Sequence, residues 1–156
     1  IVITPFNPSC VNPNSVNLTL APRLSVYDRT VIDTRNKPDV ISSTIHESGY
    51  TLSPGTLYLA STVEWTETYG LVPRIDGRSS FGRSGLFIHV TAGFGDVGFK
   101  GRWTLELVCV QPITIYPREE ICQISYHTVI GELQQYEGRY QNQQSVEPHR
   151  LWQDGK

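Results

Sequence analysis

The chain has 156 residues, of which 38% are hydrophobic and 18% are charged, and its formal net charge is −2. This length supports one domain with a core, and the composition is that of a globular protein rather than a disordered one. A charge this close to zero provides no general attraction to nucleic acid or to an anionic membrane, so neither is expected as a partner. No apolar run approaches the roughly 20 residues that cross a bilayer, and no signal-peptide pattern is present, so a cytoplasmic location is expected.

Short apolar or β-branched runs separated by turn residues follow one another along the chain, a pattern that predicts strands. Pairs such as Pro54-Gly55 and Asp76-Gly77 end these runs, and only Ser79–Ser84 is expected to form a helical turn. The sequence therefore predicts an all-β domain, built as an antiparallel sandwich or barrel. In chain order, the expected strands are Val16–Leu20, Thr56–Ser61, Phe87–Thr91, Trp103–Val110, Ile113–Tyr116 and Ile121–His127.

The run Trp103–Val110 alternates between two faces, as a half-buried strand does. Its odd-numbered residues are the apolar ones expected in the core, whereas Glu106 lies on the other face together with valines. A carboxylate in such a strand costs several kcal/mol unless it is paired or hydrogen-bonded. The strand alone leaves two interpretations open, namely a glutamate held by arginine or backbone donors for packing, and a carboxylate kept for chemistry.

The composition changes after Glu132, because Leu133–Lys156 is polar, rich in glutamine and without strand alternation. Such a segment can be a flexible terminus. Tyr136, Tyr140 and Trp152 are unusual in a solvating tail, however, and they favour a segment that folds over a ligand or another subunit.

Three cysteines, Cys10, Cys109 and Cys122, are widely spaced and odd in number, and no CxxC pair exists. We expect three reduced and mostly buried thiols rather than a disulfide or a metal site.

The segment Gly77–Gly85 contains two arginines and three serines between glycines. Small residues let backbone N–H groups approach a ligand closely, and arginine forks match phosphate oxygens. A helical turn that begins at Ser79 would direct its free N–H groups at an anion. By composition alone, a capped loop with two solvated arginines is the favoured interpretation.

Four motifs in order along the chain resemble the dCTP deaminase/dUTPase superfamily. They are NPNSVNLTL at Asn12–Leu20, GRSSFGRSGL from Gly77, HVTAGFGDVGFKGRWTLEL from His89, and YQNQQ at Tyr140–Gln144. The resemblance implies a distorted jelly-roll or β-barrel of the dUTPase-like type in a homotrimer, with active sites between subunits. It divides the chain into a β domain, residues 1–132, and a C-terminal tail, residues 133–156, that closes over the nucleotide site.

The resemblance also assigns roles to individual positions. Glu106 matches the catalytic glutamate, which shuttles protons, while Ser79 and Arg83 approach the reacting end of the base. Asp96 matches a carboxylate near the deoxyribose. The positions that the resemblance places against the nucleotide are Arg78, Ser79, Ser80, Arg83, Val90, Thr91, Ala92, Asp96, Thr104, Leu105, Glu106, Tyr136, Arg139 and Gln143.

The chain lacks the H-x-E…P-C-x-x-C signature of the zinc nucleobase deaminases, and its histidines are not spaced with cysteines as zinc ligands. We therefore expect a zinc-independent mechanism that relies on general acid–base chemistry. The resemblance implies Mg²⁺, held by the substrate triphosphate rather than by protein ligands.

The leading hypothesis is hydrolytic deamination of dCTP to dUTP and ammonia, with dTTP as a candidate inhibitor. Asp96 is then a ligand of the sugar 3′-hydroxyl, because the tail is short and lacks a dUTPase-type glycine-rich clamp. One alternative is a bifunctional dCTP deaminase/dUTP diphosphatase, or a dUTPase, that releases dUMP and pyrophosphate. A second alternative is a non-catalytic nucleotide-sensing module, which the joint presence of Asp96 and Glu106 disfavours.

Overall fold

The computed structural model describes residues 1–154. Within this range there are one α-helix, α1 (Ser79–Arg83), and two 3-10 helices, η1 (Pro8–Cys10) and η2 (Leu151–Gln153). No helix in these residues has the length and apolar character needed to cross a membrane. The strands are β1 (Val2–Thr4), β2 (Val16–Thr19), β3 (Arg23–Tyr27), β4 (Val40–Thr44), β5 (Tyr50–Leu52), β6 (Tyr58–Ser61), β7 (Trp65–Glu67), β8 (Leu71–Gly77), β9 (Leu86–Ile88), β10 (Lys100–Gly101), β11 (Thr104–Cys109), β12 (Ile113–Ile115) and β13 (Glu120–Thr128).

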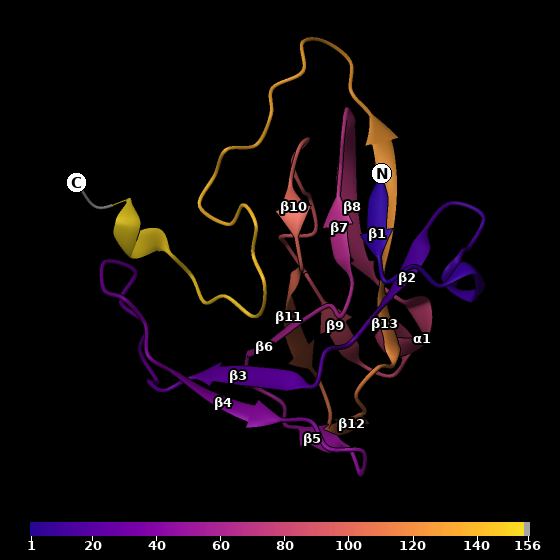
Figure 1. The fold of residues 1–156 in the computed structure, drawn as a ribbon. Helices are drawn as coiled ribbons and strands as arrows, with labels where there is room; N and C mark the ends of the chain where they lie inside the picture. Colours follow the sequence, from indigo (N-terminus) through magenta and orange to yellow (C-terminus); the bar gives the residue numbers. More distant parts are fainter. Residues whose placement is uncertain (155–156) are drawn as a thin grey trace.

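The strands pair antiparallel in four sheets (Figure 1). The largest has the order β4-β3-β6-β11-β9, and the others are β2-β13-β8, β1-β7-β10 and β12-β5. The nearly all-β fold class is therefore confirmed. The sheets stay open, because no sheet in residues 1–154 pairs its two edge strands with each other.

All six expected strands are present, with ends that differ by a few residues. Strand β9 ends at Ile88 rather than at Thr91, because His89 has a φ of 50° and so leaves the extended conformation. Strand β6 begins at Tyr58, after the turn at Pro54-Gly55. Helix α1 matches the expected helical turn. The strands that the sequence did not predict are β1, β3, β4, β5, β7, β8 and β10.

Strand β11 is the central element for the site, and its alternation is confirmed. Leu105 and Leu107 are fully buried, whereas Thr104 and Glu106 on the other face are half-buried. The buried face joins one apolar cluster with residues of β2, β8 and β13, among them Leu18, Ile75 and Ile124. Burial of one face therefore fixes the direction in which Glu106 points.

We expect Leu105→Ala to lower the free energy of unfolding by about 2–5 kcal/mol, since it removes a fully buried leucine and leaves a cavity. Urea denaturation followed by circular dichroism measures the change. The matched control is Val108→Ala on the partly exposed face of the same strand, which should cost clearly less. Equal losses for the two variants would contradict the assignment of the faces.

The three cysteines are free and buried, as expected. Burial raises the pKa of the Cys122 thiol, and the Glu64 carboxylate raises it further. A thiol held in its protonated form is a poor nucleophile and a poor metal ligand, so Cys122 belongs to the core.

The tail folds back on its own chain after β13 and passes along β10 toward η2 (Figure 1). Gln143 forms a parallel bridge with Gly101, and the Arg102 N–H donates to the Gln143 carbonyl at 2.9 Å. Tyr136 and Tyr140 pack against the core cluster. Residues 133–154 of the tail are therefore folded against their own chain rather than extended into solvent. This folded segment is called the strap below.

Candidate functional site

A pocket of about 340 Å³ lies between strand β11, the loop that precedes β10, and the tail. This volume is in the range of small-molecule sites. Residues far apart in the sequence form its wall, and six of the expected nucleotide-contacting positions are among them. They are Ala92, Asp96, Thr104, Glu106, Tyr136 and Gln143.

Glu106 lies on the pocket face of β11, and its side chain is 37% exposed. Its main chain is held on both sides, by pairing with Leu59 of β6 and by a hydrogen bond from the His89 N–H to the Glu106 carbonyl at 3.1 Å. The neighbouring His89 ring lowers the pKa of the Glu106 carboxyl, while partial burial opposes this effect. The lowered pKa favours an ionised carboxylate at neutral pH, and the pairing of the main chain fixes the point from which the side chain extends.

His89 is the residue that the sequence reasoning missed. Its side chain is only 5% exposed and its Nδ1 lies 3.6 Å from Oε2 of Glu106, which is longer than a hydrogen bond. Neither ring nitrogen has a hydrogen-bond partner within residues 1–154. The one signal in the sequence was its place directly before Val90–Ala92, whereas the contact of its ring with Glu106 follows from the pairing of β9 with β11.

The tail is attached to the same face of β11 through Thr104. The Gln143 side-chain amide donates to Thr104 Oγ1 at 2.7 Å and to the Arg102 carbonyl at 2.8 Å. The Glu147 N–H also donates to Thr104 Oγ1, at 3.0 Å. Leu105, in contrast, points into the core on the opposite face, so only its main chain faces the pocket side.

Aromatic rings and a second carboxylate form the other end of the pocket. Phe99 packs on Trp103 and Tyr136, with ring centroids 4.6 Å and 5.9 Å apart. Asp96 is exposed beside these rings and has no ion-pair partner within residues 1–154. Flat apolar surfaces next to an accessible carboxylate suit a ring-containing ligand that also bears hydroxyl groups.

The serine and arginine motif lies elsewhere. Arg78 donates from Nη1 to the Glu120 carbonyl at 2.8 Å, and it lies 3.4 Å from the Glu120 carboxylate. Ser79, Ser80 and Arg83 are exposed on α1. In Figure 1, α1 and the tail lie on opposite sides of β10 and β11. Within one chain the structure therefore does not bring these four residues to the pocket.

The remaining expected positions are also outside the pocket lining. Val90 and Thr91 are exposed in the loop after His89, and only their neighbour Ala92 lines the pocket. Arg139 forms an ion pair with Asp154 and donates to the Arg150 carbonyl at 2.6 Å.

The charge of the lining is one-sided, because it contains carboxylates but no lysine or arginine within the described chain. Nor do residues 1–154 contain a group of three or more His, Cys, Asp or Glu side chains arranged to hold a metal ion. A polyanionic ligand in this pocket would therefore need cations from outside the lining.

Comparison with known proteins assigns the family. A family model described as dCTP deaminase-like matches residues 1–129. Proteins named "dCTP deaminase, dUMP-forming" from Hathewaya histolytica and Clostridium acetobutylicum are each 54% identical over 99% of this chain and 90% of their own length. The corresponding protein of Cytophaga hutchinsonii is 52% identical over the same shares.

A solved structure, the 2′-deoxycytidine 5′-triphosphate deaminase from Agrobacterium tumefaciens, has a similar fold with a TM-score of 0.61 at 17% identity. The similarity covers 78% of this chain and 41% of that one. The fold, the family model and the relatives agree, and the chain belongs to the dCTP deaminase-like family.

Proposed function

We propose that this protein deaminates dCTP and hydrolyses the triphosphate in the same pocket, so that it releases ammonia, pyrophosphate and dUMP. The observation that carries the proposal is that Glu106 and Asp96 line one pocket of suitable size, while the third carboxylate of the lining, Glu147, is paired with Arg150. The relatives that are 52–54% identical bear the name "dCTP deaminase, dUMP-forming". This bifunctional alternative therefore has more support than our leading expectation from the sequence, in which dUTP is the product.

In the deamination step, water attacks C4 of the cytosine ring and the C4–N bond breaks. Glu106 takes a proton from the water, passes it to N3, and later delivers a proton to the departing ammonia. The first of these tasks requires an ionised carboxylate, and the lowered pKa of Glu106 keeps it in that form at neutral pH.

In the hydrolytic step, a second water attacks the α-phosphorus and the bond to the bridging oxygen of pyrophosphate breaks. Asp96 would orient this water at the sugar end of the pocket, where its carboxylate is exposed and free of an ion pair within residues 1–154. Positioning of water and phosphate contributes much of the rate in such reactions.

We also propose a homotrimer in which a neighbouring copy completes each site. The pocket lining of one chain has no lysine or arginine, whereas Arg83 is exposed on α1 without an ion pair among the described residues. Arg78, Ser79, Ser80 and Arg83 of a second copy would supply cations and donors to the triphosphate. Arg139 would join them after it leaves Asp154, and Val90–Ala92 would meet the base through main-chain groups.

Mg²⁺ belongs to the substrate in this proposal, because phosphate oxygens would hold it and the pocket has no dedicated carboxylate cage. The deamination step is assigned to Glu106 without zinc. Elemental analysis of the purified protein, with Mg²⁺ in excess in the activity assay, is the direct check on this assignment.

Analysis of the products tests the function. With dCTP and Mg²⁺, chromatography should show dUMP and pyrophosphate, and one ammonia should be released per dCTP consumed. The same preparation should convert dUTP to dUMP. Accumulation of dUTP from dCTP would show that the protein only deaminates dCTP. Hydrolysis of dUTP without reaction of dCTP would identify a dUTPase.

The pH dependence should respond to His89. In His89→Phe the ring that lowers the pKa of Glu106 is lost while burial remains, so the pKa of Glu106 rises. Deamination fails as the pH falls through the pKa of this carboxyl, so the acid limb of kcat/KM should move to higher pH. Rates measured between about pH 4 and pH 8 check the shift, with circular dichroism at each pH to verify folding. If the acid limb does not move, His89 does not control the ionisation of Glu106.

A further inference from the structure

We infer that His149 of the tail is a specificity-determining residue, which accepts a hydrogen bond from the 4-amino group of the cytosine base at the Glu106 end of the pocket. This inference rests on the proposed function and adds a contact to it. Its consequence is that the tail contributes directly to deamination, beyond covering the nucleotide.

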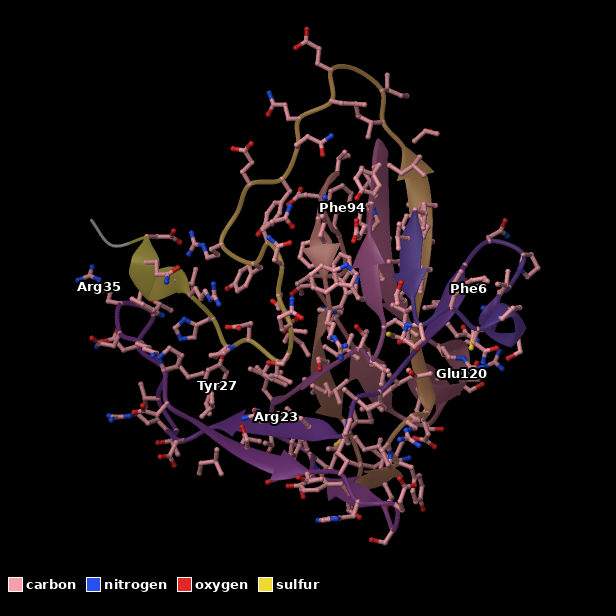
Figure 2. The ribbon with its side chains drawn as sticks, viewed as in Figure 1. Phe6, Arg23, Tyr27, Arg35, Phe94 and Glu120 are labelled. Atoms are coloured by element: carbon pink, nitrogen blue, oxygen red, sulfur yellow. The ribbon has the colours of Figure 1, made fainter. Side chains whose placement is uncertain are left out.

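The first support is the location of His149. It lines the pocket together with Glu106, and its main-chain N–H donates to the Tyr27 hydroxyl at 3.1 Å. The Tyr27 and His149 rings are 5.7 Å apart at an interplanar angle of 38°. Figure 2 shows Tyr27 at the end of β3, next to the tail. Two aromatic groups from distant segments therefore meet on one wall of the pocket.

This wall is at the end that carries Glu106. Tyr27, His149 and Glu106 all line the pocket, and burial raises the pKa of the Tyr27 hydroxyl while the hydrogen bond from the His149 N–H lowers it. Two residues before His149, the Glu147 N–H is bonded to Thr104 Oγ1, on the same face of β11 as Glu106. Independent contacts thus anchor this part of the tail beside the reacting end proposed for the base.

The second support is that both ring nitrogens of His149 are buried and have no hydrogen-bond partner within residues 1–154. A buried polar atom without a partner is unfavourable, because it has lost its hydrogen bonds to water and gained none in return. The other pocket residue with two such atoms is His89, whose Nδ1 lies 3.6 Å from the Glu106 carboxylate. Within residues 1–154, no carboxylate lies as close to either ring nitrogen of His149, so a ligand in the pocket is the natural partner.

The chemistry of cytosine fits this unsatisfied ring. The 4-amino group has two hydrogens, and a carboxylate that must also activate a water is available for only one of them. A neutral imidazole has one acceptor nitrogen, which can take the second hydrogen, and one donor nitrogen that is left for water. Uracil has a carbonyl oxygen at position 4 and offers no such hydrogen, so the contact distinguishes the substrate of deamination from its product.

The test compares three substitutions at position 149 with a control in the same tail segment. His149→Phe keeps the flat ring without nitrogens, while His149→Asn and His149→Gln restore an acceptor near the positions of Nδ1 and Nε2. Leu151→Ala is the control, because Leu151 is exposed and does not line the pocket. For each protein, kcat and KM are measured for ammonia release from dCTP, and the affinity for dUTP is measured by calorimetry with Mg²⁺ omitted, so that dUTP is bound but not hydrolysed.

We expect His149→Phe to lower kcat/KM for dCTP by roughly tenfold or more, the loss for one buried hydrogen bond, while its affinity for dUTP stays within about twofold. The Asn or the Gln variant should recover part of the rate, and Leu151→Ala should resemble the wild type. If His149→Phe lowered kcat/KM for dCTP and the affinity for dUTP equally, and neither the Asn nor the Gln variant recovered the rate, His149 would be only a packing residue of the tail. Unchanged kinetics in His149→Phe would overturn the contact altogether.

Failure of the proposed function is recognised separately, in the wild-type protein. A wild type that turns dCTP into dUTP alone refutes dUMP formation, yet the comparison of the variants still decides the role of His149. A wild type that is inert toward dCTP refutes both.

Discussion

Replacing Glu106 by glutamine should reduce deamination of dCTP by roughly 10²–10⁴-fold, because the amide keeps the shape of the side chain but cannot take a proton from water. Folding should be unaffected, since the side chain is half-exposed and its closest charged neighbour, His89, lies 3.6 Å away, beyond hydrogen-bond distance. Ammonia release under saturating dCTP is the measurement, and nucleotide binding by calorimetry shows whether the site is intact.

The control for this variant is Glu132→Gln, an equally conservative change at an exposed carboxylate just before the tail, which does not line the pocket. It should retain full activity. If Glu106→Gln kept more than about a tenth of the wild-type rate, a loss far below that expected for a general base, another residue would have to carry the proton transfer.

Replacing Asp96 by asparagine should have the complementary effect. Pyrophosphate release from dUTP should fall by roughly 10²-fold or more, because the residue proposed to orient and deprotonate the second water is neutralised. Deamination should continue, so dCTP should now yield dUTP. Chromatography of the nucleotides over time detects this accumulation.

The pair of variants forms a crossed experiment. Glu106→Gln should still hydrolyse dUTP, and Asp96→Asn should still deaminate dCTP. Asp33→Asn, an exposed aspartate in the loop after β3, is the control, because asparagine keeps the oxygen that accepts from the Arg35 N–H. Loss of both reactions in only one of the two variants would mean that a single carboxylate serves both waters, and loss of both reactions in both variants would contradict the division of roles between Glu106 and Asp96.

The sequence predicted the elements whose signal is local. The alternation in β11 fixed the buried face and singled out Glu106, since a period of two in apolar residues is the direct consequence of a strand with one face in the core. Helix α1 followed from a short segment between Gly77 and Gly85. Strands such as β4 were missed, because every residue of it is exposed and its polar run VISST has no alternation to detect.

The unpredicted parts of the site depend on contacts between distant segments. Nothing local to His89 reveals that its ring lies beside Glu106, because that contact results from the pairing of β9 with β11. The bond between His149 and Tyr27 spans more than a hundred residues. Conversely, the resemblance places the motif at Arg78 in the same site as Glu106, but helix α1, which carries this motif, lies away from the pocket of its own chain.

The way in which the tail is attached has a spectroscopic consequence. Its bridge to β10 uses main-chain groups, with the Arg102 N–H donating to Gln143 and the Asn142 N–H donating to the Lys100 carbonyl at 2.8 Å. Opening of the strap releases both amides to solvent. Their hydrogen–deuterium exchange rates therefore report the free energy of opening directly, with no probe attached and no turnover required. A bound nucleotide that holds the strap closed would slow exchange at these two amides together.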